Sequence, residues 1–159
     1  MVTRTLGRLG ILGSAVMLAL SVLLCGPARA DDQAQIAAAF TRFIEAANAH
    51  DLDAVGAIIL ESPEVVWYVN HTDAQGHEGV MRYFERVFDG RWSAKPDLSR
   101  AKWTRMGPGS WKLVLPIVIA EGSSDGPAQP LDFEVSQAWL LTAEGWKLLG
   151  FVTRSEPAP

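Results

Sequence analysis

Residues 33–59 read QAQIAAAFTRFIEAANAHDLDAVGAII, and this stretch decides the fold class of the N-terminal half. Large apolar residues recur there at steps of three and four, the spacing of one buried face on an amphipathic helix. These residues are Ile36, Phe40, Phe43, Ile44 and Ala47. The spacing predicts a helix over 33–49 that ends at Asn48–His50. We predict a second helix through Ile59 with Asp51 as its N-cap, because a carboxylate oxygen can accept from the N–H groups of the first turn.

The rest of the chain carries one more helical pattern and several strand patterns. Val65–Val69 is β-branched and aromatic, which predicts a strand, and 70–76 is a polar, turn-rich segment that we expect to be a loop. Gly76–Gly79 leads into apolar residues at helical spacing from Val80 to Phe88, which predict a third, short helix that Asp89-Gly90 ends. Further strands are expected at Leu98–Met106, Trp111–Glu121, Leu131–Thr142 and Trp146–Arg154. This order predicts an α+β domain in which helices lie on one face of a strongly curved, mainly antiparallel sheet.

The first 30 residues have the organisation of a cleavable signal peptide. Arg4 and Arg8 precede an almost wholly apolar run over 9–24, and small residues follow at Ala28 and Ala30, where a signal peptidase reads them. We expect cleavage after Ala30 and a periplasmic or secreted protein with a single domain over 31–159.

Two alternatives, a membrane-spanning anchor and a lipidated N-terminus, are less consistent with the sequence of residues 1–30. The apolar run is shorter than the roughly 20 residues that a spanning helix needs. Cys25 is a poor lipidation site, because the preceding Leu24 is large where lipoprotein signals have a small residue. We therefore expect no stable membrane insertion after cleavage.

Cleavage changes the composition that bears on function. The full chain has 14 Lys+Arg, 18 Asp+Glu and one cysteine; without residues 1–30 it has 11 basic and 18 acidic residues, a formal net charge of −7, and no cysteine. A disulfide framework, a zinc–thiolate site and a cysteine nucleophile are then excluded. The acidic balance argues against a nucleic-acid partner, which would need clustered Lys and Arg. The sequence lacks a GxGxxG, P-loop, HExxH or GxSxG motif, and we expect no cofactor.

Several segments together resemble a known superfamily. They are FIEAANAHDLDAV at 43–55, the strand segment at 63–69, and Gly76-x-x-Gly79 followed by Tyr83-Phe84. They resemble the nuclear transport factor 2-like superfamily, in particular its SnoaL-like and ketosteroid isomerase-like members, over about residues 33–154. The resemblance implies a cone-shaped roll, with about three N-terminal helices packed on the curved sheet. It is specific for the fold and weak for function, because this scaffold hosts isomerases, cyclases, dehydratases and association domains.

The resemblance also bears on the reaction. Ketosteroid isomerases use an aspartate base with a tyrosine and a protonated aspartic acid as hydrogen-bond donors. Alignment with such members puts Phe43 at the tyrosine position, Trp67 at the base position and Gln137 near the second aspartic acid. Phe cannot donate a hydrogen bond and Trp carries no carboxylate, so we do not expect steroid-isomerase chemistry by this mechanism.

The resemblance implies a cavity inside the cone, and the period of two along each strand assigns side chains to it. The expected lining is aromatic and mostly apolar: Phe40, Phe43, Trp67, Val69, Phe84, Gln137 and Trp139. Such a cavity suits a small hydrophobic molecule, and binding one is the function we expect first. The alternative is a solid core, since regularly spaced aromatic residues usually fill an interior.

Titratable residues gather between the first strand and the third helix. His71, Asp73 and His77 lie there, and in related folds this region is near the cavity mouth. The second expected function is therefore an enzyme of the isomerase, cyclase or dehydratase type with His71 or Asp73 as base. Gln137 or Tyr68 would be its hydrogen-bond donor. The irregular spacing of these residues is a weak metal signal, and we expect no metal site.

The segment Leu113–Ala120 is apolar at every position, so both faces of the predicted strand require burial. The inward face can meet the helices, and the outward face needs another cover. Sheet-to-sheet homodimers are common in the superfamily that the chain resembles. We therefore expect a homodimer through the sheet. The third expected function follows from this: an interaction module whose cavity is filled and whose sheet forms the interface.

Overall fold

The computed structural model describes residues 28–155. In chain order its elements are α1 (Ala28–Asn48), α2 (Leu52–Ile58), β1 (Val66–Val69), β2 (Thr72–Gln75), α3 (Gly76–Phe88), β3 (Arg91–Pro96), the 3-10 turn η1 (Leu98–Arg100), β4 (Lys102–Gly107), β5 (Ser110–Gly122), β6 (Gln129–Thr142) and β7 (Gly145–Ser155). Residues 1–27 of the expected signal peptide lie outside the described residues, and the expected cut after Ala30 lies within the first turn of α1. Within 28–155, no helix is both long and apolar enough to cross a membrane.

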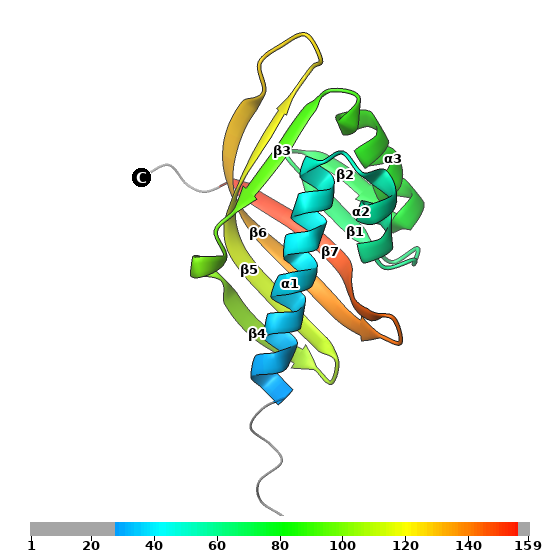
Figure 1. The fold of residues 1–159 in the computed structure, drawn as a ribbon, viewed down its shortest axis with the longest axis vertical. Helices are drawn as coiled ribbons and strands as arrows, with labels where there is room; N and C mark the ends of the chain where they lie inside the picture. Colours follow the sequence, from blue (N-terminus) through cyan, green and yellow to red (C-terminus); the bar gives the residue numbers. More distant parts are fainter. Residues whose placement is uncertain (1–27, 156–159) are drawn as a thin grey trace, which may run out of the picture.

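The strands form one curved, mixed sheet in the order β2-β1-β7-β6-β5-β3, with β4 also paired to β5. Every pairing is antiparallel except that of β1 with β7, which is parallel. Figure 1 shows α1 running across the sheet, with α2 and α3 packed beside it near β1 and β2. The expectation of an α+β fold, with helices on one face of a mainly antiparallel sheet, is confirmed.

The two N-terminal helices form for the reasons that their sequence indicates. Ile36, Phe40 and Phe43 on α1 are at most 1% exposed, so the apolar stripe is the buried face. The Asp51 carboxylate accepts from the N–H of Ala54 at 3.0 Å, which confirms the N-cap of α2.

Two strands were not expected from the sequence. The polar segment predicted as a loop over 70–76 contains β2, which pairs with β1 through the register Val69↔Thr72. Asn70 and His71 link the two strands with φ of 46° and 65°, and this left-handed pair closes a two-residue hairpin. Burial on one face only explains why the sequence of β2 reads as polar: its residues alternate between half-buried and exposed.

The second unexpected strand is β3. It occupies one edge of the sheet, antiparallel to β5, and Trp92 and Ala94 on its inner face are buried. Asn48 at the end of α1 ties it to the helix, because the Asn48 side chain accepts from the Ala94 N–H at 2.7 Å and donates to the Ala94 carbonyl at 3.0 Å. Two alternating inward residues in a short, proline-ended segment give too weak a period-two signal for a sequence prediction.

Candidate functional site

The inner face of the sheet aligns side chains from distant segments in rows. One row joins Trp67 on β1, Phe151 on β7, Gln137 on β6 and Leu113 on β5, since these residues are register partners on successive strands. All of them are at most 2% exposed. The row lies beneath the apolar face of α1, so the sheet positions aromatic and amide groups at the centre of the cone.

The residues expected to line a cavity do converge here, and their rings contact one another. Trp67 stacks on Phe151 with a centroid separation of 4.3 Å. The centroid of the Phe43 ring lies 5.9 Å from that of Trp67, 6.0 Å from that of Phe84 and 6.2 Å from that of Phe151. The rings of Phe40 and Trp139 pack edge to face, with their centroids 6.4 Å apart. Val69 is buried one row away, at 2% exposure. Aromatic side chains therefore fill the region between Phe43 and Trp67.

The buried amide of Gln137 is only half satisfied. Its Oε1 accepts from the Trp139 indole N–H at 2.9 Å, while its Nε2 has no hydrogen-bond partner. A buried donor without a partner costs about 1–3 kcal/mol of desolvation. This amide is thus a point in the cone where an acceptor atom from outside the chain would be stabilised.

A second polar group lies where α3 meets the end of β5. The Tyr83 hydroxyl donates to Glu121 Oε1 at 2.7 Å, and Tyr83 is 3% exposed while Glu121 is half-buried. Burial raises the pKa of Tyr83, and the hydrogen bond to the Glu121 carboxylate together with its negative charge raises it further. The indole N–H groups of Trp92 and Trp67 act on the same oxygen and oppose the rise. Tyr83 therefore remains a neutral phenol that donates to a carboxylate.

The two indoles beside Tyr83 direct their N–H groups toward its hydroxyl oxygen without completing a hydrogen bond. Trp67 is 1% exposed and Trp92 is 6% exposed, and neither Nε1 is near enough and well enough aligned for a hydrogen bond. The Tyr83 ring lies 5.9 Å from the Trp67 ring. Four residues, which we call the Tyr83 cluster, thus combine a carboxylate, a phenol and two buried indole N–H donors without a complete hydrogen bond: Tyr83, Glu121, Trp67 and Trp92.

A small cavity of about 70 Å³ opens beside Glu121, which is room for more than one water molecule. Its lining comes from the β1–β2 turn, the end of β5 and the start of β6: Asn70, Ile119, Glu121, Gln129, Leu131 and Phe133. Phe133 and Asn70 also line a surface pocket of about 190 Å³ that reaches Tyr68 and His71. The Tyr83 cluster therefore lies beside the part of the cone that opens toward solvent.

Of the residues expected to act as catalytic base, His71 lines the surface pocket outside the cone and Asp73 lies on the outer face of the sheet. His71 is exposed in the β1–β2 turn, where its Nδ1 is 3.5 Å from the Tyr68 hydroxyl. Asp73 is exposed on β2 and pairs with Tyr68, so it shares the outer face of the sheet, opposite to Trp67. His77 is on α3, where its Nε2 is 3.3 Å from the Gly56 carbonyl oxygen. The β1–β2 hairpin explains this placement, because its period of two turns Asp73 away from the cone.

Comparison with known proteins agrees with the fold. Residues 40–108 match the model of the SnoaL-like domain. The resemblance to the nuclear transport factor 2-like superfamily is confirmed. A superfamily protein from Salmonella enterica serovar Typhimurium aligns with a TM-score of 0.71 and 14% identity, over 82% of this chain and 94% of that chain. No curated protein sequence matches the chain significantly.

Two further solved structures with a similar fold come from Novosphingobium aromaticivorans. One is described as a candidate aromatic ring hydroxylase, with a TM-score of 0.71 and 18% identity over 82% of this chain and 92% of that chain. The other is described as a candidate scytalone dehydratase, with a TM-score of 0.70 and 10% identity over 80% and 86% of the two chains. At these identities the likeness establishes the fold alone.

Sequence reasoning missed most of the Tyr83 cluster. Trp92 lies on the strand that was not predicted, and Tyr83 entered only as part of the resemblance. A signal for Glu121 was present: it continues the alternation of Ile117 and Ile119, which face inward on β5. A carboxylate in phase with buried residues marks a candidate functional group.

Proposed function

We propose that this SnoaL-like protein binds a small, largely apolar molecule inside its aromatic cone and holds the polar atom of that molecule at the Tyr83 cluster. The observation that carries the proposal is the pair of buried indole N–H groups of Trp67 and Trp92, which approach the Tyr83 hydroxyl but complete no hydrogen bond. Buried donors without partners are uncommon in folded proteins, and a ligand atom that accepts from them removes their desolvation cost.

The chemistry of the unpartnered atoms narrows the class of ligand. Within residues 28–155, the buried side-chain atoms without a hydrogen bond are Trp67 Nε1, Trp92 Nε1, Trp146 Nε1 and Gln137 Nε2. All of these atoms carry N–H donors, so a complementary ligand offers acceptor oxygen atoms. The Glu121 carboxylate repels an anion, which favours a neutral carbonyl or ether compound over a carboxylate. A ring-sized neutral ketone fits this description.

Entry of such a ligand requires one of the aromatic side chains to move, because the rings at the centre of the cone contact one another. Phe133 lines both the 70 Å³ cavity beside Glu121 and the surface pocket next to it. We propose that Phe133 moves to admit the ligand from this side.

The test compares two bicyclic probes of nearly equal size, 1-tetralone and tetralin, by tryptophan fluorescence and calorimetry. Tetralone is expected to bind roughly 2- to 10-fold more tightly, since one hydrogen bond contributes about 0.5–1.5 kcal/mol.

Trp67→Asp is expected to abolish binding, because it removes a stacked ring and places a carboxylate in the cone. Trp146→Phe is the matched control: it removes another buried indole N–H, on β7 beside the β6–β7 turn. Absence of saturable binding across a wide set of neutral aromatic ketones would refute the proposal.

A second candidate function is catalysis, and the 2.7 Å contact between Tyr83 and Glu121 favours it. A carboxylate could take a proton from a carbon next to a ligand carbonyl, while the indole N–H groups of Trp67 and Trp92 stabilise the resulting oxyanion. Glu121→Gln keeps the side-chain size and removes the base. Loss of turnover of a bound ketone with retained binding would support catalysis, and unchanged hydrogen exchange at that carbon would refute it.

We also propose that the protein is exported and forms a homodimer through the outer face of the sheet. Support for export is the charged-apolar-small order of residues 1–30. Support for the dimer is a set of apolar residues on the outer face, where Val66 is 48% exposed, Val152 is 40% exposed and Val114 is half-buried. N-terminal sequencing of the protein recovered outside the cytoplasm tests the cut after Ala30. Sedimentation at micromolar concentration tests the dimer, and Val114→Lys is expected to shift it toward monomer.

A further inference from the structure

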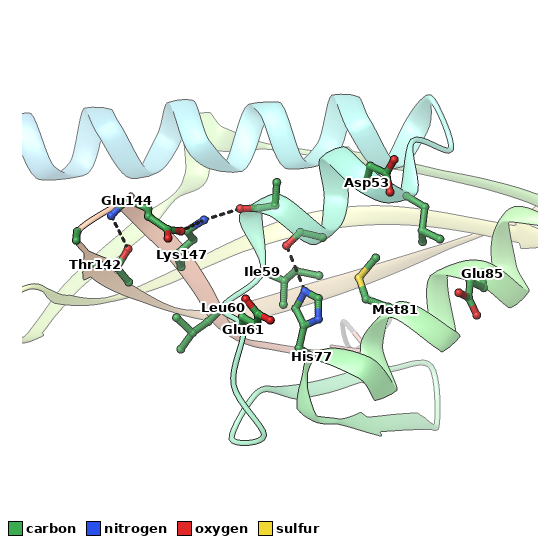
Figure 2. Close-up of a pocket in the computed structure, with 14 residues that line it drawn as sticks. Asp53, Ile59, Leu60, Glu61, His77, Met81, Glu85, Thr142, Glu144 and Lys147 are labelled. Atoms are coloured by element: carbon green, nitrogen blue, oxygen red, sulfur yellow. Dashed lines mark hydrogen bonds and ion pairs between the residues drawn. The ribbon is translucent and has the colours of Figure 1, made fainter.

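A second concave surface lies outside the cone, between α2, α3 and the β6–β7 turn. This groove has a volume of about 770 Å³, within the range of small-ligand and peptide sites. Figure 2 shows Ile59, Leu60 and Met81 in its middle part, with side chains from α2 above and α3 below. Gly56 contributes to the depth of the groove, because a Cβ there would lie 3.1 Å from the Met81 methyl group.

The basic groups of the groove are held by the protein itself. Lys147 Nζ donates to the Ala57 carbonyl at 2.7 Å and pairs with Glu144 at 3.1 Å, and only 17% of its side chain is exposed. His77 Nε2 lies 3.3 Å from the Gly56 carbonyl. Both contacts satisfy carbonyls in the last turn of α2, which has no basic residue of its own. These two side chains are therefore directed toward the protein and are committed to stabilising α2.

The acidic side chains of the groove, unlike those of Lys147 and His77, are exposed to solvent. Asp53, Glu61 and Glu85 are exposed, and in the described part of the chain they make neither an ion pair nor a side-chain hydrogen bond. Figure 2 shows Asp53 and Glu85 at one end of the groove, Glu144 at the other and Glu61 between them. Glu144 pairs with Lys147, whereas Asp53, Glu61 and Glu85 have no partner among the described residues, so the groove has a net negative rim around an apolar floor.

We infer that this groove binds a short, extended peptide segment of a partner protein, with an apolar centre and a basic residue at each end, one facing Asp53 and Glu85 and the other facing Glu61. Charge complementarity selects the basic ends, and the apolar floor selects the centre. The groove follows α2, whose seven residues span about 10 Å, so a segment of about four extended residues covers its length. This inference is independent of the ligand proposed for the cone.

The experiment follows backbone amide shifts of the isotope-labelled protein by NMR during titration. The probe is the acetylated and amidated tetrapeptide lysine-leucine-leucine-lysine. The expected result is saturable shifts at Gly56, Met81 and Glu85 that weaken with added salt. The double variant Glu61→Gln/Glu85→Gln is expected to bind roughly 2- to 25-fold more weakly, since each exposed ion pair contributes about 0.2–1 kcal/mol. Glu45→Gln, an exposed change on α1 outside the groove, is the matched control and is expected to bind as the unaltered protein does.

Three comparison probes decide the alternatives. The glutamate-leucine-leucine-glutamate peptide is expected not to bind, and equal binding would overturn the role of charge. The lysine-glycine-glycine-lysine peptide is expected to bind several-fold more weakly, and equal binding would overturn the role of the apolar floor. Spermidine is expected to give weaker shifts at these amides; if it binds as tightly as the first peptide, the groove is a site for organic cations and the inference is wrong.

Discussion

The hydrogen bond between Tyr83 and Glu121 predicts a specific dependence of stability on pH. Tyr83→Phe keeps the buried ring and removes the hydroxyl that donates to the carboxylate at 2.7 Å. A hydrogen bond to a charged group contributes about 1.5–3 kcal/mol, and the half-buried position of Glu121 lets water replace part of it. We therefore expect the variant to be less stable by about 1.5 kcal/mol at pH 7.

The difference is expected to vanish at alkaline pH. The pKa of Tyr83 in the folded state is raised above its ordinary value of 10.0, chiefly by burial and then by Glu121. Above pH 10 the unfolded chain loses the Tyr83 proton while the folded chain keeps it, so the stability from this residue is present below pH 10 and falls as the pH rises. At pH 11 the loss is about 1.4 kcal/mol. The unaltered protein and Tyr83→Phe should then be nearly equally stable.

Urea unfolding at pH 7, 9 and 11, followed by far-UV circular dichroism, measures this difference. Ionisation of lysine and of the other tyrosine is common to both proteins and cancels in the comparison. Tyr68→Phe controls for loss of a hydroxyl at pH 7, where a surface change is expected to cost less than about 0.5 kcal/mol. A gap between unaltered protein and Tyr83→Phe that stays constant from pH 7 to 11 would show that folding leaves the pKa of Tyr83 unshifted, and the account of the cluster would be wrong.

Three further changes test the packing that positions the cone. Asn48→Ala removes both hydrogen bonds to the backbone of Ala94, and we expect a loss of about 2 kcal/mol with fraying of β3, measured by amide hydrogen exchange. Asp51→Ala removes the N-cap of α2 and is expected to cost about 1 kcal/mol in urea unfolding, with Asp51→Asn restoring most of it. Gly90→Ala places a Cβ against the carbonyl oxygen of Gly122, so the backbone at the β3–β5 edge must shift. We expect a lower melting temperature; an unchanged one would contradict the close approach.

The sequence was sufficient for most of the helices and for the long strands. The stripe on α1, the Asp51 cap and the continuous apolar run of β5 are local patterns with one favoured structure each. The short strands β2 and β3 could not be predicted, because the first has a polar sequence and the second offers only Trp92 and Ala94 as inward residues. Both depend on a neighbouring strand for their hydrogen bonds, and no local pattern encodes that partner.

The residues of the candidate site also divide into those that the sequence predicted and those that only the tertiary structure brings together. The sequence by itself predicted that aromatic residues would dominate the interior, with Phe43, Trp67 and Gln137 among the inward side chains, and all three are buried. Only the tertiary structure decided that His71 and Asp73 face outward and that Tyr83, Glu121 and the indoles of Trp67 and Trp92 meet. The reason is physical: helical and strand periods fix which face a side chain takes, whereas sheet register and helix packing fix which faces meet.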